Sequence, residues 1–206
     1  MKSKEIIKLL HNVANKIEEE KDFLTKLDNE IGDGDHGVNL ARGFLEVDKV
    51  IDSLIDKLPS DIMKSVGMTL ISKVGGASGP LYGTAFLKLS MSFKDKEDIN
   101  LNDFLIAFND AIDGIKMRGK SNQGEKTMLD AMIPAYEAML KENSEGKPIK
   151  EVLLAGVKEA NNGVEYTKTI IATKGRASYV GERSIGHQDP GATSFTMMLE
   201  ELSKVL

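Results

Sequence analysis

The chain has 206 residues, of which 41% are hydrophobic, and a formal net charge of −5. This length and composition predict a single globular domain over residues 1–206. The acidic charge, the absence of Trp and an aromatic content of 5% argue against nucleic acid as a partner. Because the chain contains no Cys, disulfides, thiol nucleophiles and Cys-ligated metals are excluded.

The N-terminal segment carries no long apolar run after its first charged residues. Neither a signal peptide nor a membrane-spanning helix, which needs about 20 apolar residues, is therefore expected. We expect a cytoplasmic protein without a membrane partner.

Apolar residues recur at three- and four-residue spacing along most of the chain, and this period is typical of amphipathic helices. No alternating strand pattern occurs, so the sequence predicts an all-α fold. Residues 174–191 form a long polar segment punctuated by glycine, a kind of segment that is usually functional or mobile. The predicted helices cover residues 4–20 with a further turn up to Leu27, 38–58, 60–74 with Ser60 as N-cap, 81–93, 101–119, 127–141 with Pro134 near its start or at a kink, 149–173 with a weak point at 161–163, and 192–206.

The stretch Asp28–Gly37 lies between the first two of these helices and contains three glycines, four acidic residues and no Lys or Arg. Carboxylates held within about 4 to 6 Å of one another repel, unless a cation keeps them ionised. Hard oxygen ligands on a short glycine-containing turn suit Mg²⁺ or Ca²⁺. The acidic side chains, and hence the candidate ligands, are Asp28, Glu30, Asp33 and Asp35.

Two familiar motifs do not explain this stretch. An EF-hand beginning at Asp33 would place Phe44 where a bidentate Glu is required, which favours Mg²⁺ over Ca²⁺. The glycines satisfy the dinucleotide pattern G-x-G-x-x-G, but no apolar strand precedes them and the aspartates would repel a bare pyrophosphate. A phosphate held through a metal fits better. A polar surface loop with helix-capping aspartates remains the alternative.

If residues 36–39 begin the next helix, their free backbone N–H groups and the helix dipole would face a metal-bound phosphate. His36 is also a candidate phosphoryl-accepting nucleophile, because it adjoins the predicted metal. Residues 186–193 have the glycine spacing of a P-loop, but Ala192 occupies the position of the required Lys. This second segment is equally consistent with a plain loop in which Asp189 or Thr193 caps the last helix.

Several separate stretches together resemble the nucleotide-binding L subunit of dihydroxyacetone kinases, including the matching domain of the single-chain, ATP-dependent enzymes. The resemblance covers nearly the whole chain. The stretches are residues 27–37, 75–80, 118–120, 126–128 and 174–194.

The resemblance implies an antiparallel barrel of eight α-helices with the nucleotide site among the loops at one end. It also implies two Mg²⁺ ions on Asp28, Asp33 and Asp35, and it places Glu30 outside the ligand set. Together with Arg176, these three aspartates would serve catalysis by positioning and charge stabilisation. The residues expected to surround ADP, or ATP when charged, are His36, Gly37, Val38, Asn39, Ala77, Ser78, Gly119, Met128, Arg176, Asp189, Pro190 and Gly191.

Two branches of this family differ in the phosphoryl donor. In the phosphoenolpyruvate-dependent phosphotransferase branch, ADP stays bound as a coenzyme, accepts a phosphoryl group from a phosphohistidine on the M subunit and passes it to dihydroxyacetone on the K subunit. The ATP-dependent enzymes normally fuse this domain to a K-like one. Since 206 residues leave no room for that second domain, we expect the phosphotransferase branch.

Three other interpretations stay open at this stage. The chain could be the nucleotide-binding subunit of an ATP-dependent dihydroxyacetone kinase, a non-catalytic metal-binding helical interaction module, or an aspartate-dependent phosphohydrolase. A phosphoenzyme on His36 is a rival mechanism to direct transfer through the nucleotide.

Overall fold

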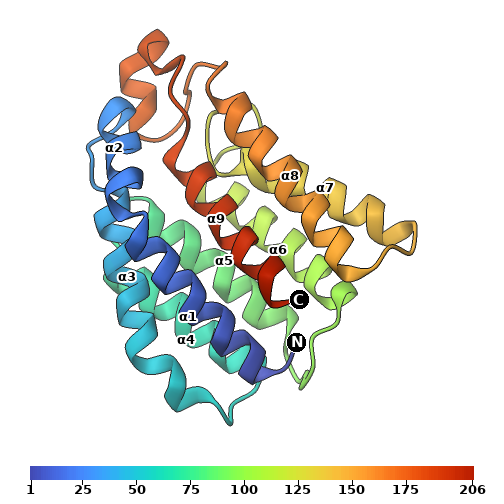
Figure 1. Cartoon of the computed structure of the whole chain (residues 1–206). Helices are drawn as coiled ribbons and strands as arrows, with labels where there is room; N and C mark the ends of the chain where they lie inside the picture. The colour runs from blue at the N-terminus through green and yellow to red at the C-terminus, as the bar shows by residue number, and fades with distance from the viewer.

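The computed structural model describes residues 1–206 and contains nine α-helices, two short 3₁₀ helices and no strand, which confirms the all-α prediction. Glu20 alone separates the first two helices, which follow one another along one side of the molecule (Figure 1). The elements are α1 (Ser3–Glu19), α2 (Lys21–Ile31), α3 (His36–Ile51), η1 (Asp52–Leu54), α4 (Pro59–Lys73), α5 (Ser78–Ser92), α6 (Leu101–Gly119), α7 (Leu129–Ser144), α8 (Ile149–Thr167), η2 (Arg176–Ser184) and α9 (Pro190–Val205).

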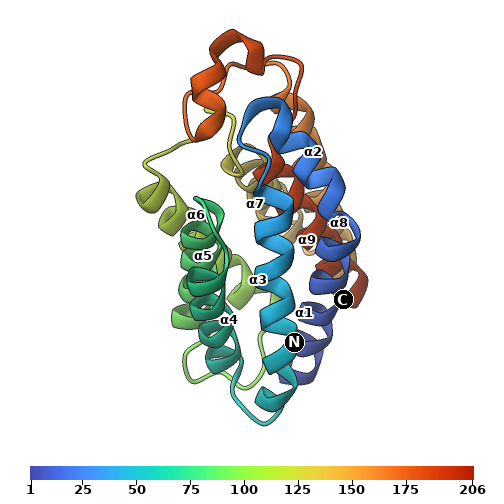
Figure 2. The ribbon, with the colours of Figure 1, turned by 90° about the vertical axis from the view of Figure 1, so that its left-hand side faces the viewer.

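The helix contacts close into a ring. Helix α1 packs on α3, each helix from α3 to α8 packs on the next, and α9 returns to α1. If α1 and α2 count as one interrupted helix, the ring has the eight members of the predicted barrel. Figure 2 shows the helices lying roughly antiparallel, with η2 above α2 at one end of the molecule. Helices α3, α5, α7 and α9 begin at that end, so the loops that precede them lie together there. We call it the loop end of the ring.

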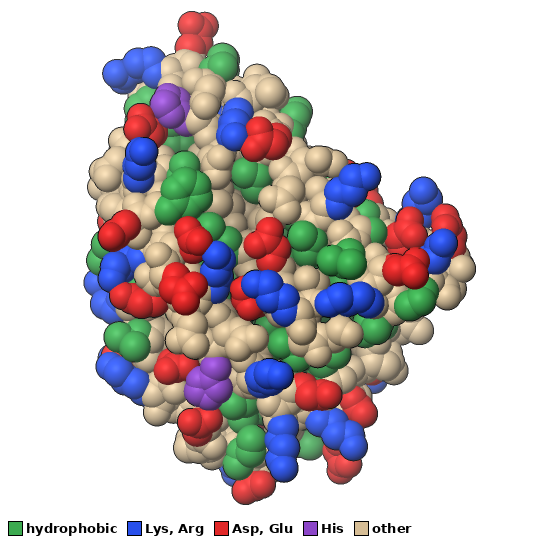
Figure 3. Space-filling model, in the orientation of Figure 1, with side chains coloured by type: hydrophobic (Ala, Val, Ile, Leu, Met, Phe, Trp, Pro, Cys, Tyr) green, Lys and Arg blue, Asp and Glu red, His purple; other side chains and the backbone are tan.

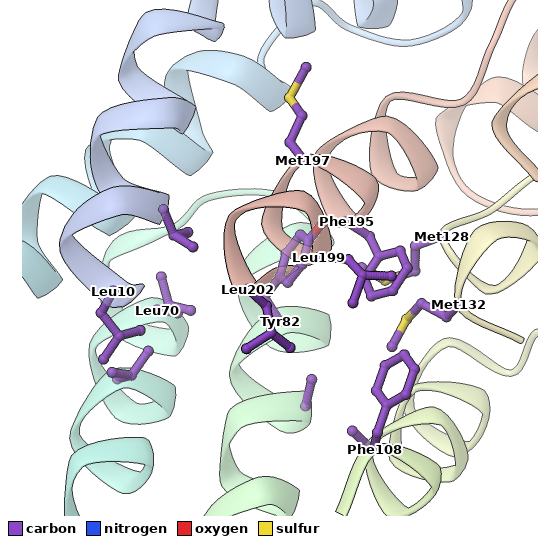
Figure 4. Packing of buried hydrophobic residues seen from close by; sticks show 14 of the residues in the cluster. Leu10, Leu70, Tyr82, Phe108, Met128, Met132, Phe195, Met197, Leu199 and Leu202 are labelled. Carbon is purple, nitrogen blue, oxygen red and sulfur yellow. The ribbon is translucent and has the colours of Figure 1, made fainter. Parts of the chain in front are cut away.

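One hydrophobic cluster of 42 buried residues fills the interior of the ring. Phe108 of α6 and Phe195 of α9 stack with ring centroids 5.7 Å apart, and Met132 of α7 lies beside them (Figure 4). A cavity of about 130 Å³ remains within this cluster, and every side chain that lines it is hydrophobic, including Tyr82 and Met128 near the loop end. The inward faces of the amphipathic helices thus meet in a single core, which is the packing that their periodicity predicts.

Several helices begin or end at other residues than the sequence predicts. Helix α4 begins at Pro59, with Leu58 and not Ser60 in the N-cap position, because the fixed φ of proline suits the first helical residue. Helix α3 ends at Ile51 and gives way to η1, and Pro134 lies inside α7. Residues 161–163 are no break, since α8 runs through them to Thr167.

Helix α8 ends before residue 173 because Thr167 makes contacts that compete with helix continuation. Its hydroxyl donates to the Val164 carbonyl at 2.6 Å and accepts from the Asp189 N–H at 2.9 Å. The Thr167 carbonyl accepts a hydrogen bond from the ammonium group of Lys126. Side-chain hydrogen bonds of this kind offer the backbone an alternative to the helical ladder.

The face seen in Figure 3 mixes acidic and basic side chains, with hydrophobic ones scattered singly between them. No extended area of positive charge appears on this face, in keeping with the net charge of −5. None of the helices combines the length and the apolar composition needed to cross a membrane.

We predict that a Gly163→Ala substitution destabilises the fold by about 2 kcal/mol. A Cβ atom at Gly163 would lie 2.1 Å from the Asp130 carbonyl oxygen and 2.8 Å from the Ala131 Cα, both rigid backbone atoms of α7 or its first turn. The gain of about 1 kcal/mol in helix propensity is smaller than this collision. Urea-induced unfolding of the variant measures the difference.

Gly114→Ala is the matched control for that substitution. Its added Cβ would lie 2.9 Å from Cγ of Lys88 and 3.1 Å from Cγ2 of Thr84, and these side-chain atoms can shift more readily than the backbone of a helix. Its free energy of unfolding should therefore stay within about 1 kcal/mol of the unaltered protein. Equal effects of the two substitutions would contradict the close α7–α8 backbone approach.

A further prediction concerns His11 of α1, which joins this helix to the end of α3. Its Nδ1 lies 2.6 Å from Asp48 and its Nε2 lies 2.8 Å from Asp52. Partial burial lowers the pKa of His11, but the hydrogen bonds and charges of Asp52 and Asp48 outweigh it and the pKa is raised overall. The charged imidazolium therefore stabilises the fold below its unfolded pKa of about 6.5, and this stability is lost as pH rises through the raised folded pKa.

We expect the His11→Gln variant to lose this pH-dependent part of its stability. Because the two ion pairs are partly exposed, the contribution should be below about 1 kcal/mol. Urea unfolding at a series of pH values from 5.5 to about 8.5, spanning the unfolded pKa, measures it. A variant whose unfolding free energy follows the same pH curve as the unaltered protein would contradict the assignment.

Candidate functional site

Three of the four acidic side chains predicted from the sequence converge at the α2–α3 loop. Ligand oxygens of Asp28, Asp33 and Asp35 all lie within 4.8 Å of one another. Asp28 is buried in the last turn of α2, and the other two are exposed on the loop. Gly34 has a φ of +71°, a left-handed conformation that glycine adopts without strain, and this residue turns the chain between them. Glu30 is not part of the cluster, and its carboxylate lies 3.7 Å from His187 Nδ1.

Asp28 has two roles in this geometry. Its Oδ2 accepts hydrogen bonds from the backbone N–H groups of Asp35 at 2.8 Å and His36 at 3.1 Å, which fixes the start of α3. The prediction that the N–H groups of residues 36–39 are free is therefore wrong for two of them. The His36 N–H donates to Asp28, and the Asn39 N–H donates to the Asp35 carbonyl at 2.9 Å. The N–H groups of residues 37 and 38 have no partner within the chain and point to the loop end.

A cation from a distant segment offsets part of this negative charge. Residues 168–188, which we call the strap, connect α8 to α9 and contain η2. Arg176 of the strap places a guanidinium nitrogen 3.1 Å from Asp33 Oδ2, and its side chain is 67% exposed. Three carboxylates against one guanidinium still leave net negative charge, and this set of hard oxygen donors fits Mg²⁺.

His36 lies beside the carboxylates but inside the protein. Its Nδ1 is 2.9 Å from the Ser78 hydroxyl, and its Nε2 is 2.9 Å from the Ser194 hydroxyl, which in turn lies 2.7 Å from the Tyr82 hydroxyl. Burial lowers the pKa of His36 to about 4, against the opposing charge of Asp28. The imidazole is therefore neutral near pH 7. With both ring nitrogens engaged and the residue 7% exposed, it is poorly placed to attack a phosphoryl group.

The α4–α5 turn completes the wall next to Asp35. A Cβ atom at Gly76 would lie 3.8 Å from the Asp35 carboxylate, and Gly75 packs against Asn39. Ala77 and Ser78 then begin α5. The structure thus brings residues of the second predicted stretch directly beside the acidic loop.

The start of α9 forms the opposite wall. Asp189 caps this helix by accepting from the Ala192 N–H at 2.7 Å, which confirms the predicted cap. Its burial raises the pKa of Asp189 to about 7, an effect that the Ala192 hydrogen bond opposes. Pro190 is the first helical residue, and a Cβ at Gly191 would lie 3.5 Å from the Met128 Cβ.

Two predicted nucleotide contacts are placed less directly. Met128 is 5% exposed and belongs to the core cluster, with its backbone near Gly191. Gly119 ends α6, and a Cβ there would lie 3.4 Å from Leu81 of α5. Both residues nevertheless lie at the loop end of the ring, because α6 ends there at Gly119 and α7 begins there directly after Met128.

Sequence reasoning missed three residues of this site: Tyr82, Lys126 and Ser194. Ser194 bonds His36 directly and Tyr82 bonds Ser194, and their buried hydroxyls lie on helices that look like ordinary core helices in the sequence. Lys126 stands between a glycine-containing loop and an apolar helix. A lysine at such a position is exposed in most proteins, so no sequence pattern indicates its burial.

Comparison with known proteins places this chain in a family. The model of the DAK2 domain matches residues 30–204. The PEP-dependent dihydroxyacetone kinase, ADP-binding subunit DhaL, of Escherichia coli is 41% identical over 97% of this chain and 95% of its own length. The PTS-dependent counterpart of Lactococcus lactis is 44% identical over 97% of this chain and 96% of its own.

A solved structure shares the fold. The dihydroxyacetone kinase from C. freundii in complex with AMP-PNP and Mg²⁺ superimposes with a TM-score of 0.74 at 22% identity. The match covers 96% of this chain and 33% of that one. At this identity the likeness concerns the helical architecture.

Proposed function

Because the chain belongs to the DAK2 domain family, we propose that residues 1–206 act as one nucleotide-binding domain, the L subunit of a dihydroxyacetone phosphotransferase. In this proposal the subunit carries ADP as a bound coenzyme. It takes a phosphoryl group from a phosphohistidine on an M subunit and passes it to dihydroxyacetone on a K subunit. The names of the bacterial relatives, ADP-binding subunits of PEP- or PTS-dependent dihydroxyacetone kinases, support this assignment.

The observation that carries the proposal is the convergence of three carboxylates and one guanidinium at the loop end. Asp28, Asp33 and Asp35 would hold two Mg²⁺ ions, and Asp28 would at the same time keep α3 in register. When bound, magnesium-ADP would supply the phosphate oxygen that accepts and releases the phosphoryl group, with its charge neutralised by the metal.

The remaining residues would bind and orient the nucleotide. The free N–H groups of Gly37 and Val38 at the start of α3 would donate to phosphate oxygens, as would the hydroxyl of Ser78. His36 stays neutral and holds Ser78 through its Nδ1. Arg176 would place positive charge beside the transferred group. Ala77, Gly119, Met128 and the segment Asp189–Gly191 would form the walls.

This arrangement needs no phosphorylated side chain. A phosphoenzyme on His36 is disfavoured by the burial of that residue and by its two serine hydrogen bonds. The two mechanisms differ in one measurement. After phosphorylation and denaturation, phosphate should leave with the nucleotide, whereas an acid-labile adduct on the protein would support the phosphoenzyme.

Denaturing the purified protein and assaying the supernatant for adenine nucleotide tests the proposal. We expect ADP to be retained stoichiometrically, at least after incubation with Mg²⁺ and ADP. No binding under these conditions would favour the non-catalytic helical module. Release of inorganic phosphate from ATP without any acceptor would favour the phosphohydrolase.

A second candidate is the nucleotide subunit of an ATP-dependent dihydroxyacetone kinase, which the structural likeness to the C. freundii enzyme favours. Reconstitution separates the two. With the K subunit present, the phosphotransferase should make dihydroxyacetone phosphate from the phosphorylated M subunit and not from free ATP. The opposite donor preference would establish the second candidate.

A further inference from the structure

Lys126, just before α7, is the one Lys or Arg side chain of the protein that is buried. Its residue exposure is 1%, although lysine is almost never fully buried without a partner. Its backbone has a φ of +60°, a left-handed conformation that is strained for a non-glycine residue. Both features require that the side chain is held firmly by its surroundings.

The partners of its ammonium group are backbone carbonyls, and no carboxylate pairs with it directly. The three N–H bonds of the ammonium match three close acceptors. These acceptors are the carbonyl oxygens of Thr167 at 2.5 Å, Ser184 at 2.7 Å and His187 at 2.5 Å. A fourth carbonyl, that of Ile170, is more distant at 3.4 Å.

The acceptors lie at three points of the chain that control the strap. Thr167 is the last residue of α8, Ser184 ends η2, and His187 precedes Asp189, the cap of α9. The last turn of α8 contains no basic residue of its own, so Lys126 supplies the positive charge that its terminal carbonyls favour. One ammonium group therefore fastens both ends of the strap.

Charge and burial both act on this ammonium. Burial lowers the pKa of Lys126, and the negative charges of Asp189 and Asp130 act in the opposite direction. Without the ammonium, three inward-facing carbonyls would lose their donors in a dry site, and an unsatisfied buried carbonyl destabilises the fold. The base of the strap would then open toward water.

Besides Lys126, the strap is joined to the rest of the chain by contacts with Glu125. The Thr173 N–H donates to the Glu125 carbonyl at 3.3 Å, and the Thr173 hydroxyl and the Lys174 ammonium lie 3.3 and 3.7 Å from the Glu125 carboxylate. Within the strap, the Gly186 N–H bonds the Lys168 carbonyl at 2.7 Å, and the Ala172 N–H bonds the Ser184 hydroxyl at 2.9 Å. Near its tip, Ala177 packs with Ile31 of α2 in a cluster of only three buried residues. The guanidinium of Arg176 reaches Asp33 from this segment, which lies above α2 in Figure 2.

We propose that Lys126 is a positioning residue for the nucleotide site: its ammonium holds the carbonyls of Thr167, Ser184 and His187 and thereby sets the strap so that Arg176 lies over the acidic loop. Lys126 touches neither the nucleotide nor the metal in this scheme. The inference deepens the proposed function and rests on it for the meaning of Arg176, but the fastening of the strap can be measured without any nucleotide.

The test uses Lys126→Gly, since glycine accepts the left-handed backbone and the space left by the side chain can admit a free ammonium ion. We expect the Kd for magnesium-ADP to rise by about 10-fold or more, with unchanged helicity by circular dichroism. Ammonium chloride should restore much of the affinity by filling the carbonyl cage. Tetramethylammonium chloride at the same ionic strength cannot donate hydrogen bonds and should not.

Trypsin gives the readout that is independent of the nucleotide. Cleavage after Arg176 and Arg183 should be faster by about 10-fold in Lys126→Gly than in the unaltered protein, and ammonium should slow it again. If the unaltered protein binds no magnesium-ADP, the proposed function fails, while this cleavage assay still decides the role of Lys126. Unchanged cleavage, or no effect of ammonium on it, would overturn the inference.

Coupling to Arg176 separates positioning from general destabilisation. Arg176→Ala should weaken magnesium-ADP binding in the unaltered background and have little further effect in Lys126→Gly, because the arginine is already misplaced. Purely additive effects would overturn the inference. Should Lys126→Gly fail to fold, Lys126→Met, which keeps the volume and removes the charge, takes its place in the cleavage and coupling assays.

Lys150→Met is the matched control. The ammonium of Lys150 also donates to a backbone carbonyl, that of Ser203, but both residues lie near the end of the ring opposite the strap. Its nucleotide affinity and its cleavage pattern within the strap should match the unaltered protein, with no response to ammonium. A response equal to that of Lys126→Gly would overturn the specific role of Lys126.

Discussion

An Asp33→Asn variant is expected to bind ADP in the presence of Mg²⁺ at least about 100-fold more weakly than the unaltered protein, since loss of a ligand should cost no less than loss of a residue that only supports one. Asp33 contributes a carboxylate oxygen to the three-residue cluster and is also the partner of Arg176. Asparagine keeps the size of the side chain but removes one of the three negative charges that favour a divalent cation. Isothermal titration with and without Mg²⁺ measures the effect.

Without Mg²⁺, Asp33→Asn is not expected to weaken ADP binding. In the presence of a chelator, removal of a carboxylate reduces its repulsion of the diphosphate, so the affinity for free ADP should stay the same or rise. The helicity should not change, because Asp33 is exposed on the α2–α3 loop and, unlike Asp28, accepts no backbone hydrogen bond that fixes a helix. Equal losses with and without Mg²⁺ would show that Asp33 acts on the fold and not through a metal.

Glu30→Gln is the matched control for Asp33→Asn. Glu30 is an exposed acid of the same region, but it lies outside the cluster of Asp28, Asp33 and Asp35. The control removes the same charge from the same neighbourhood, so a general electrostatic effect would weaken both variants alike. We expect the Mg²⁺-dependent affinity of Glu30→Gln to remain within about 3-fold of the unaltered protein.

Replacement of Arg176 by Ala is expected to lower the rate of phosphoryl transfer by about 1,000-fold, the lower limit of what an arginine beside a transferred phosphoryl group contributes. The ground-state affinity for magnesium-ADP should fall much less, because the charge that Arg176 stabilises develops mainly during transfer. Single-turnover transfer from the phosphorylated M subunit, alongside titration with ADP, measures both quantities.

Arg176→Lys and Arg183→Ala frame this second prediction. Lysine keeps the charge but lacks the planar fork of donors, so its rate should lie between those of the alanine variant and the unaltered protein. Arg183 is exposed on the same strap and forms no ion pair with the acidic loop, so its removal should leave the rate unchanged. An Arg176→Ala variant whose affinity and rate fall by the same factor would indicate that Arg176 binds the nucleotide uniformly and does not favour the transition state.

Much of the architecture was predictable because it depends on local patterns. The three- and four-residue spacing of apolar residues predicts the helices, and the ring is one way to bury all their inward faces at once. The convergence of the three carboxylates was also predictable, because Asp28, Asp33 and Asp35 are neighbours in the chain and a short loop cannot separate them widely. Among the acids, only the resemblance to a family set Glu30 apart.

Other parts of the site depend on contacts between distant segments, which local patterns do not encode. His36 meets Ser194 across 158 residues of sequence, and Lys126 meets His187 across 61. The end of α8 likewise depends on Thr167, whose partners Lys126 and Asp189 come from other elements. A sequence pattern can suggest that such residues are polar or helical, but not which of them will be buried together.

The sequence by itself determined the helical class and the acidic loop, and it predicted a hard divalent cation there, because helix periodicity and local charge act over a few residues. The tertiary structure alone decided that Arg176 compensates Asp33, that His36 is neutral and held by two serines, and that Lys126 fastens the strap. These features arise only when packing removes side chains from water, since burial shifts the pKa of a histidine and forces an ammonium group to find every hydrogen bond it can make.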